Sequence, residues 1–122
     1  MIRYSEQLID KKDIESVVKV LKSKFLTTGP VVKKFERHIT KKINAKFGVS
    51  FNSATSALHV ACMALGLNKN DYLWTSVNTF VASSNCALYC GAKVDFVDIE
   101  MDSYNLDLDK LEKKLFLTKK KK

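Results

Sequence analysis

Residues 47–66, with the sequence FGVSFNSATSALHVACMALG, decide the fold. The apolar opening Phe47–Phe51 predicts a buried strand, and the helical pattern from Ser56 to Leu65 predicts a helix that stops at Gly66. Between them, the polar turn Asn52–Thr55 leads directly into the start of the helix. The free backbone N–H groups and the positive end of the helix dipole favour an anion there, phosphate above all.

The hydroxyl groups of this turn leave two interpretations open. Ser53 and Thr55 can donate hydrogen bonds to a bound phosphate. They can equally cap the helix, because Ser and Thr are common N-cap residues in proteins of every kind. The local sequence does not decide between a phosphate site and a simple cap.

The composition is that of a globular protein of modest size. The chain has 122 residues, of which 46% are hydrophobic and 28% charged. No apolar run is long enough to span a bilayer and the first residues lack a signal-peptide core, so we predict a cytoplasmic protein without a membrane partner. The net charge is +8, and residues 119–122 supply four of those charges. Lysines outnumber the two arginines and no aromatic residues interleave with them, so we predict a solvated surface and no nucleic-acid partner.

N-terminal to residues 47–66, we predict a helical segment over residues 1–46. The sequence predicts that Asp10 caps an amphipathic helix that ends near Ser23, and that Pro30 occupies the first turn of a second helix. The loop between these helices holds Phe25 and Leu26. A loop with two apolar residues either packs beneath another element or contacts a ligand, and both interpretations stay open.

After Gly66 the pattern of strand, polar turn and helix repeats. We predict strands at Tyr72–Thr75 and Lys93–Val97, a helix over Phe80–Cys90, and a last helix capped by Asp107. Strands that alternate with helices predict an α/β fold with a mostly parallel sheet and flanking helices. We assign 47–118 to this partial domain and 119–122 to a Lys-rich tail.

The sequence predicts two further features: a ligand site at the polar turns and an incomplete fold at the last helix. Asn52–Thr55 and Ser76–Thr79 both follow predicted strands, and ligands of parallel sheets bind at those strand ends. The last helix has no following strand, so we expect an incomplete fold that opens a longer protein.

Cys62, Cys86 and Cys90 are expected to be buried free thiols, without a metal site.

Five segments in a fixed order carry a resemblance to a known family: FLTTGP, KKFERHI, NSATSALHVACMALGL, NTFVASSNCALYCGAKVDFVDI and YNLDLDKLE. Together they resemble the N-terminal part of the pyridoxal-phosphate-dependent sugar-nucleotide aminotransferases of the DegT/DnrJ/EryC1/StrS family. The YSEQ start with NSATSAL is most similar to the UDP-sugar transaminase branch of the pseudaminic acid pathway. The resemblance implies the large domain of a fold-type I transferase that requires pyridoxal 5′-phosphate.

The resemblance also implies roles for individual residues. Ser53, Ala54 and Thr55 correspond to the turn that binds the cofactor phosphate, and Phe80 to the aromatic residue that stacks on the pyridine ring. The residues that match the sugar-nucleotide pocket are Tyr4, Lys24, Phe25, Leu26 and Thr27. From the residue pattern alone, Phe80 can also be an ordinary core residue at a helix start.

The resemblance further implies the reaction and its partners. Family members transfer an amino group to a keto-sugar nucleotide, with L-glutamate as the expected donor, and the full-length enzymes are homodimers. The lysine that forms a Schiff base with the cofactor lies beyond position 122 in the family, so no catalytic residue is assigned and the chain alone is expected to be inactive. Two alternatives stay open: a sugar dehydratase of the same fold, and a small basic interaction protein that binds nucleic acid through its tail.

Overall fold

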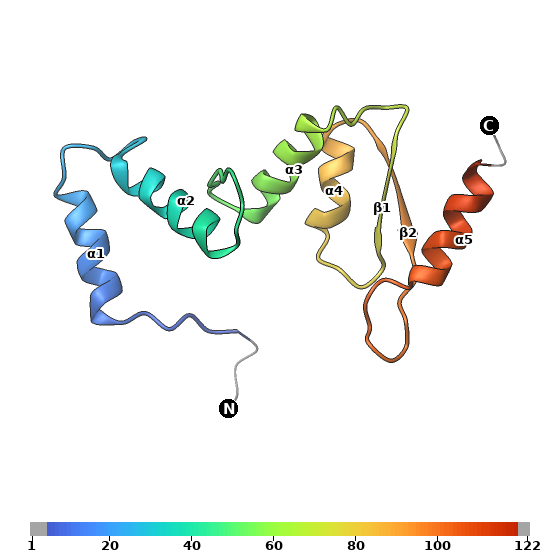
Figure 1. Ribbon diagram of the computed structural model, residues 1–122, viewed down its shortest axis with the longest axis horizontal. Helices are drawn as coiled ribbons and strands as arrows, with labels where there is room; N and C mark the ends of the chain where they lie inside the picture. Colours follow the sequence, from blue (N-terminus) through green and yellow to red (C-terminus); the bar gives the residue numbers. More distant parts are fainter. Residues whose placement is uncertain (1–4, 120–122) are drawn as a thin grey trace. The chain divides into compact units, whose positions relative to one another are not determined.

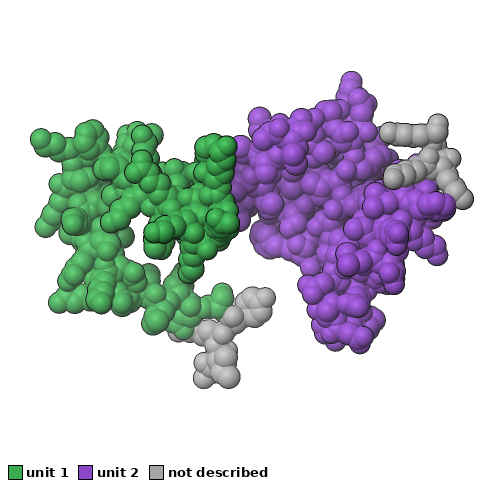
Figure 2. Space-filling view, in the orientation of Figure 1, with its two compact units in different colours: residues 1–50 green, residues 51–122 purple. Residues whose placement is uncertain are grey.

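The computed structural model describes residues 5–119 of the chain (Figure 1). The chain divides into two compact units, residues 1–50 and 51–122 (Figure 2), and each is described by itself. Among the described residues, none of the helices has the length and apolar character needed to cross a membrane.

The first unit contains two helices, α1 (Lys11–Leu21) and α2 (Pro30–Lys42). Asp10 caps α1 in a reciprocal box: its carboxylate accepts the Asp13 N–H at 3.0 Å, and the Asp13 carboxylate accepts the Asp10 N–H at 3.0 Å. Pro30 occupies the first turn of α2, where its missing N–H would have no intrahelical partner. Both predicted helix starts are confirmed.

Neither helix of the first unit buries a side chain. Each helix has an apolar stripe, as the spacing predicts, yet the residues of both stripes remain exposed: Ile14, Val17, Val18 and Leu21 on α1, and Val32, Phe35 and Ile39 on α2. Isolated helices of this length are marginal in water, and helices in proteins draw most of their stability from the packing of the apolar stripe. The first unit therefore has helices without a core of its own.

The predicted strand Phe47–Phe51 is wrong. These residues stay extended, but among the described residues no second strand pairs with them. The Ser50 N–H, which a sheet would use in its ladder, donates instead to Glu36 Oε1 at 2.8 Å, and the Ser50 hydroxyl donates to the same oxygen at 2.9 Å. Gly48 lies so close to α2 that an added Cβ would sit 2.7 Å from Thr40 Cγ2. The segment packs on α2, where the Glu36 carboxylate takes the place of the backbone acceptor that a neighbouring strand would provide.

The second unit has a small sheet flanked by helices. Its elements are α3 (Ala54–Ala64), β1 (Tyr72–Ser76), α4 (Ala82–Tyr89), β2 (Lys93–Val97) and α5 (Leu108–Lys119). The two strands pair in parallel, with Trp74 opposite Asp95. Helix α4 packs against both strands and against α3. The predicted partial α/β domain with a parallel sheet is confirmed, although two strands form where three were expected.

Glycine ends two helices of this unit in the same way. Gly66 follows α3 with φ +75° and Gly91 follows α4 with φ +73°, a region that residues with a Cβ rarely adopt. In each case the next N–H returns to a carbonyl of the helix: Leu67 donates to Cys62 and Ala92 to Ala87. The stop predicted at Gly66 is confirmed.

The core of the second unit is built from small side chains. The buried apolar residues are Cys62, Ala82, Cys86, Ala87, Ala92 and Val97. All three cysteines are free; Cys62 and Cys86 are buried as expected, whereas Cys90 is half-buried. Burial, helped by a hydrogen bond with Cys86, raises the pKa of the Cys62 thiol to about 11. A thiol with such a pKa is almost entirely protonated at neutral pH and is therefore unreactive.

Candidate functional site

The candidate site begins at the first turn of α3. Ser53 is the N-cap residue, with extended backbone angles, and its hydroxyl oxygen accepts the Ser56 N–H at 3.1 Å. The hydroxyls of Ser53 and Ser56 also lie 3.0 Å apart, in hydrogen-bond contact. The Ser53 side chain thus performs the capping role that the sequence left open.

The backbone of the same turn presents donors without acceptors. Ala54 and Thr55 lie in the first turn, where an α-helix provides no acceptor for its N–H groups, and no cap within residues 5–119 takes them up. The first turn of α3 holds no acidic residue. Its positive dipole end is therefore not compensated locally, and the turn suits an anionic group.

The position of this turn agrees with that of a ligand site in an α/β unit. Helices α3 and α4 lie side by side, and both begin at the end of the second unit where β1 and β2 finish (Figure 1). Ligands of parallel sheets bind at this edge. The second polar turn, Ser76–Thr79, is at the same edge, where the Asn78 N–H donates to Ser76 Oγ at 3.2 Å. Both predicted turns therefore lie in the second unit, near helix starts.

Phe80 lies in the segment that joins β1 to α4. Its side chain is 76% exposed, so it is not a core residue, and α4 begins two residues later than predicted. The Phe80 carbonyl accepts the Ser83 N–H at 2.9 Å, which fixes its backbone at the start of α4. The exposed ring is available for contact at the edge that carries the two polar turns.

The residues predicted to contact the sugar nucleotide fall elsewhere in the chain. Lys24, Phe25, Leu26 and Thr27 form the loop between α1 and α2, within the first unit, whereas Tyr4 lies outside the described residues. The Ser23 hydroxyl donates to the Phe25 carbonyl at 3.2 Å, which tightens the loop. The side chains of Phe25 and Leu26 are exposed, so neither packs beneath another element of this unit.

Two lysines of α5 were not predicted to have a role, yet they hold this helix to the end of β2. Lys114 Nζ lies 2.6 Å from Asp95 Oδ2 and donates to the Phe96 carbonyl at 2.7 Å. Lys110 Nζ donates to Asp98 Oδ2 at 2.9 Å. The sequence contains the signal for these pairs, because two lysines four residues apart on a helix match one aspartate within β2 and a second three residues later, just after the strand.

These ion pairs lower the pKa of both aspartates. The Lys114 ammonium, followed by the Phe96 N–H, holds the pKa of Asp95 below its usual value of 3.8, and Lys110 does the same for Asp98. A carboxyl group with a lowered pKa in the folded state stabilises that state above the unfolded pKa, and this contribution is lost as the pH falls through the folded value. We therefore expect the contribution of these two pairs to the attachment of α5 to be complete above about pH 3.8 and to be lost as the pH falls below that value.

The single tryptophan reports this transition. Lys114 Nζ lies 5.1 Å from the Trp74 ring centroid, so loss of the pair changes the surroundings of the indole. An acid titration followed by tryptophan fluorescence should be flat from pH 7 to about pH 4 and change below it. The Lys114→Gln variant should lack the step assigned to Asp95. An unchanged titration in that variant would contradict the role of the pair.

Within residues 5–119, no three His, Cys, Asp or Glu side chains are grouped so that they could hold a metal ion. His59 makes an edge contact with the Tyr89 ring at 5.2 Å between centroids. The polar groups at the sheet edge are hydroxyls and backbone N–H groups, a donor set that suits an anion.

Comparison with known proteins assigns the chain to a family. The DegT/DnrJ/EryC1/StrS aminotransferase family matches residues 7–122. The chain is 47% identical, over 94% of its length, to the UDP-4-amino-4,6-dideoxy-N-acetyl-beta-L-altrosamine transaminase of Campylobacter jejuni, and it spans 30% of that protein.

Solved structures give the same result. A putative sugar aminotransferase of Streptococcus pneumoniae, Spr1654, in its PLP form, matches 92% of this chain with a TM-score of 0.87 and 33% identity; the match covers 29% of Spr1654. PseC of Helicobacter pylori, an aminotransferase involved in the biosynthesis of pseudaminic acid, matches 91% with a TM-score of 0.83 and 36% identity, over 30% of PseC. The chain belongs to the DegT/DnrJ/EryC1/StrS aminotransferase family, and spans about 30% of the length of the relatives it matches.

Proposed function

We propose that this chain supplies the phosphate-binding part of a pyridoxal 5′-phosphate site in a sugar-nucleotide aminotransferase. The observation that carries the proposal is the first turn of α3, where the N–H groups of Ala54 and Thr55 have no described acceptor at the edge where β1 and β2 end. A phosphate group, with a charge of about −1.5 to −2 at neutral pH, matches these donors and the helix dipole.

The residues present fit the cofactor at two points. Ala54 and Thr55 would bind the phosphate through their backbone, with the Thr55 hydroxyl as a further donor, while Ser53 orients the turn through its bond to Ser56. Phe80, exposed at the start of α4, would cover one face of the pyridine ring. When bound, the cofactor supplies an electron sink for transfer of the amino group.

The finer assignment concerns the substrate and the assembly. We assign the loop Lys24–Thr27, together with Tyr4, to recognition of a UDP-linked keto-sugar, with L-glutamate as the amino donor and a homodimer as the complete enzyme. The support is the similarity to the Campylobacter jejuni transaminase and the exposure of Phe25 and Leu26 in the loop. We place the reaction in the cytoplasm, in the synthesis of surface polysaccharides.

The chain alone is proposed to be catalytically incompetent. Three lysines of the second unit make other contacts: Lys93 Nζ lies 5.2 Å from the Tyr72 ring centroid, Lys110 pairs with Asp98, and Lys114 pairs with Asp95. None of these contacts places an amine at the first turn of α3. A transaminase requires such an amine at the cofactor, both to hold it covalently and to move a proton.

A labelling experiment tests both parts of the proposal. The purified chain is incubated with pyridoxal 5′-phosphate, reduced with borohydride and mapped by mass spectrometry, with pyridoxal as the control that lacks the phosphate. We expect low labelling that is spread over the exposed lysines. In a second measurement, amide hydrogen exchange with each compound present, we expect only the phosphorylated compound to protect residues 52–56. One lysine labelled at one equivalent would contradict the proposed incompetence, and equal protection by pyridoxal would contradict the phosphate site.

A further inference from the structure

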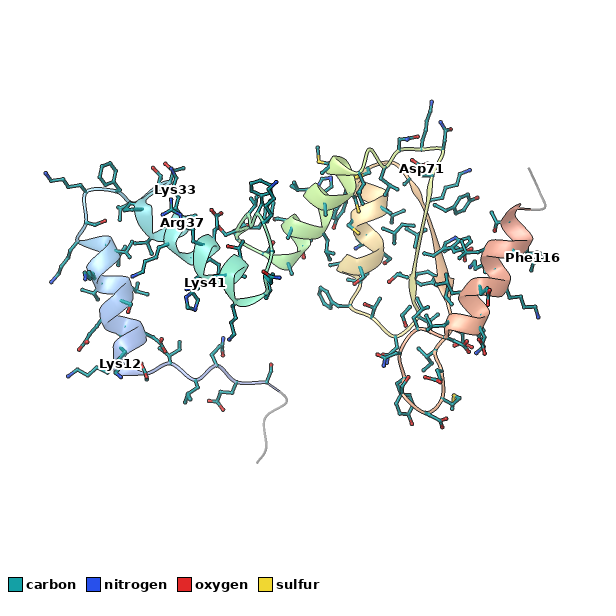
Figure 3. The ribbon with its side chains drawn as sticks, in the orientation of Figure 1. Lys12, Lys33, Arg37, Lys41, Asp71 and Phe116 are labelled. Carbon is teal, nitrogen blue, oxygen red and sulfur yellow. The ribbon has the colours of Figure 1, made fainter. Side chains whose placement is uncertain are left out.

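The segment that joins β1 to α4 carries an exposed aromatic ring whose direction is set by its backbone. Phe80 is 76% exposed, and among residues 5–119 its ring makes no contact with another aromatic ring or with a lysine ammonium. In Figure 3 this segment lies at the far end of β1 from the labelled Asp71, which comes just before the strand. Because so little packs against the ring, the position of the Phe80 backbone decides where the side chain can reach.

Ser83 holds this segment at two points. Its N–H donates to the Phe80 carbonyl at 2.9 Å, and its hydroxyl oxygen accepts a hydrogen bond from the Thr79 hydroxyl at 2.9 Å. The first bond joins backbone groups and would survive loss of the Ser83 side chain. The second requires a hydroxyl group at both positions. The hydroxyl pair is therefore the contact that these two side chains add to the start of α4.

The start of α4 depends on such a contact because it lacks an ordinary cap. Its N-cap position is Val81, which offers no side-chain acceptor, whereas Ser53 caps α3. The buried Ser84 hydroxyl donates to the Val81 carbonyl at 2.9 Å, so Val81 is tied to the helix. Among the described residues, the Thr79–Ser83 bond is the one side-chain hydrogen bond that spans Phe80.

We propose that Ser83 is a positioning residue for the ring of Phe80. Its hydroxyl holds the backbone of Thr79 and Phe80 so that the Phe80 ring faces the pyridine ring of the bound cofactor. This inference rests on the proposed function and adds to it the residue that sets the place of the ring relative to the phosphate. Helices α3 and α4 provide a common frame for both contacts, because they pack against each other. Ser83 acts through Thr79 and is assigned no contact with the cofactor itself.

A purely structural role for Ser83 makes a different prediction. If the hydroxyl pair served only to keep α4 folded, its loss would disturb the packing of α4 on α3 and would weaken every ligand at this edge alike. A positioning role weakens only those ligands that carry a ring for Phe80 to cover. Two phosphate compounds, one with a ring and one without, therefore separate the two roles.

The test is an amide-resolved NMR titration of the full chain with pyridoxine 5′-phosphate and, separately, with methyl phosphate. Ser83→Ala should weaken pyridoxine 5′-phosphate at least about threefold, as expected for one hydrogen bond, and leave methyl phosphate unchanged. Thr79→Val keeps the branched shape without the donor and should have the same effect. Ser83→Thr retains the hydroxyl and should restore the affinity. Ser103→Ala, which removes a hydroxyl from the loop between β2 and α5, is the matched control and should change neither affinity.

Further measurements show whether the effect passes through the ring. Phe80→Leu should weaken pyridoxine 5′-phosphate selectively, and in that background Ser83→Ala should cause no further loss. Amide hydrogen exchange of the free chain gives a readout without ligand: Ser83→Ala should speed exchange at Phe80 and Val81, and Ser83→Thr should reverse it. Unchanged exchange at Ala87 in the middle of α4 shows that the variant helix is folded.

Three results would overturn this inference. The first is an equal weakening of both compounds by Ser83→Ala, which would assign the hydroxyl a structural role. The second is an unchanged affinity for pyridoxine 5′-phosphate in Ser83→Ala. The third is a full additional loss from Ser83→Ala in the Phe80→Leu background, which would show that the hydroxyl acts apart from the ring. A chain that binds neither compound would instead overturn the proposed function, whereas the three results above leave phosphate binding at α3 in place.

Discussion

Replacing Thr55 with Asp is expected to weaken phosphate binding at α3 at least tenfold without destabilising the helix. Thr55 lies in the first turn, where a carboxylate interacts favourably with the helix dipole by about 0.3–1 kcal/mol. The same carboxylate repels a phosphate that would bind to the N–H groups of Ala54 and Thr55. Because an energetic loss of about 1.4 kcal/mol is tenfold in affinity, we expect at least a tenfold weaker affinity for pyridoxine 5′-phosphate.

The neutral variant Thr55→Asn is the matched control. It has nearly the same shape as Thr55→Asp and lacks the charge, so it should lose at most the contribution of the hydroxyl group. Binding is measured by calorimetry with pyridoxine 5′-phosphate, which has no aldehyde to react with surface lysines, and stability by thermal denaturation. If Asp and Asn lower the affinity equally, charge repulsion at the first turn of α3 is not the cause.

Replacing Ala87 with Leu is expected to cause the largest loss of stability. Ala87 is 0% exposed and lies on α4, which packs against both strands and against α3. Extra methylene groups in a closely packed core cost about 1–3 kcal/mol, since side chains and backbone must shift to admit them. For a unit of this size we expect the thermal midpoint to fall by roughly 10 °C.

Ala61→Leu serves as the control for this substitution. Ala61 is exposed on α3, so the added side chain projects into water and should change the midpoint little. Differential scanning calorimetry or circular dichroism gives both midpoints. Equal midpoints for Ala87→Leu and the unaltered chain would show that α4 does not pack closely on the sheet.

Features that depend on neighbours in the sequence were predicted correctly. Asp10 caps α1, Pro30 opens α2 and Gly66 ends α3, and each depends on backbone chemistry within about four residues. Strands β1 and β2 were also predicted, because each carries an apolar run between turn residues and the two have each other as partners. For these elements the local pattern and the final structure agree.

Features that depend on distant partners were not predicted. Phe47–Phe51 has the composition of a strand, but a strand forms only when a neighbour pairs with its backbone, and Glu36 takes the Ser50 N–H instead. The bonds from Lys110 to Asp98 and from Lys114 to the Phe96 carbonyl likewise join separate elements of the fold. The family resemblance placed Ala54 and Thr55 at the phosphate, and those assignments remain predictions.

The central claim is that the first turn of α3 binds the phosphate of the cofactor. An amide-resolved NMR titration of the full chain with pyridoxine 5′-phosphate, with pyridoxine in parallel, tests this most directly. The account predicts saturable shifts of the Ala54 and Thr55 amides with the phosphorylated compound and none with pyridoxine. Shifts confined to the lysine-rich helices, or identical shifts with both compounds, would contradict it.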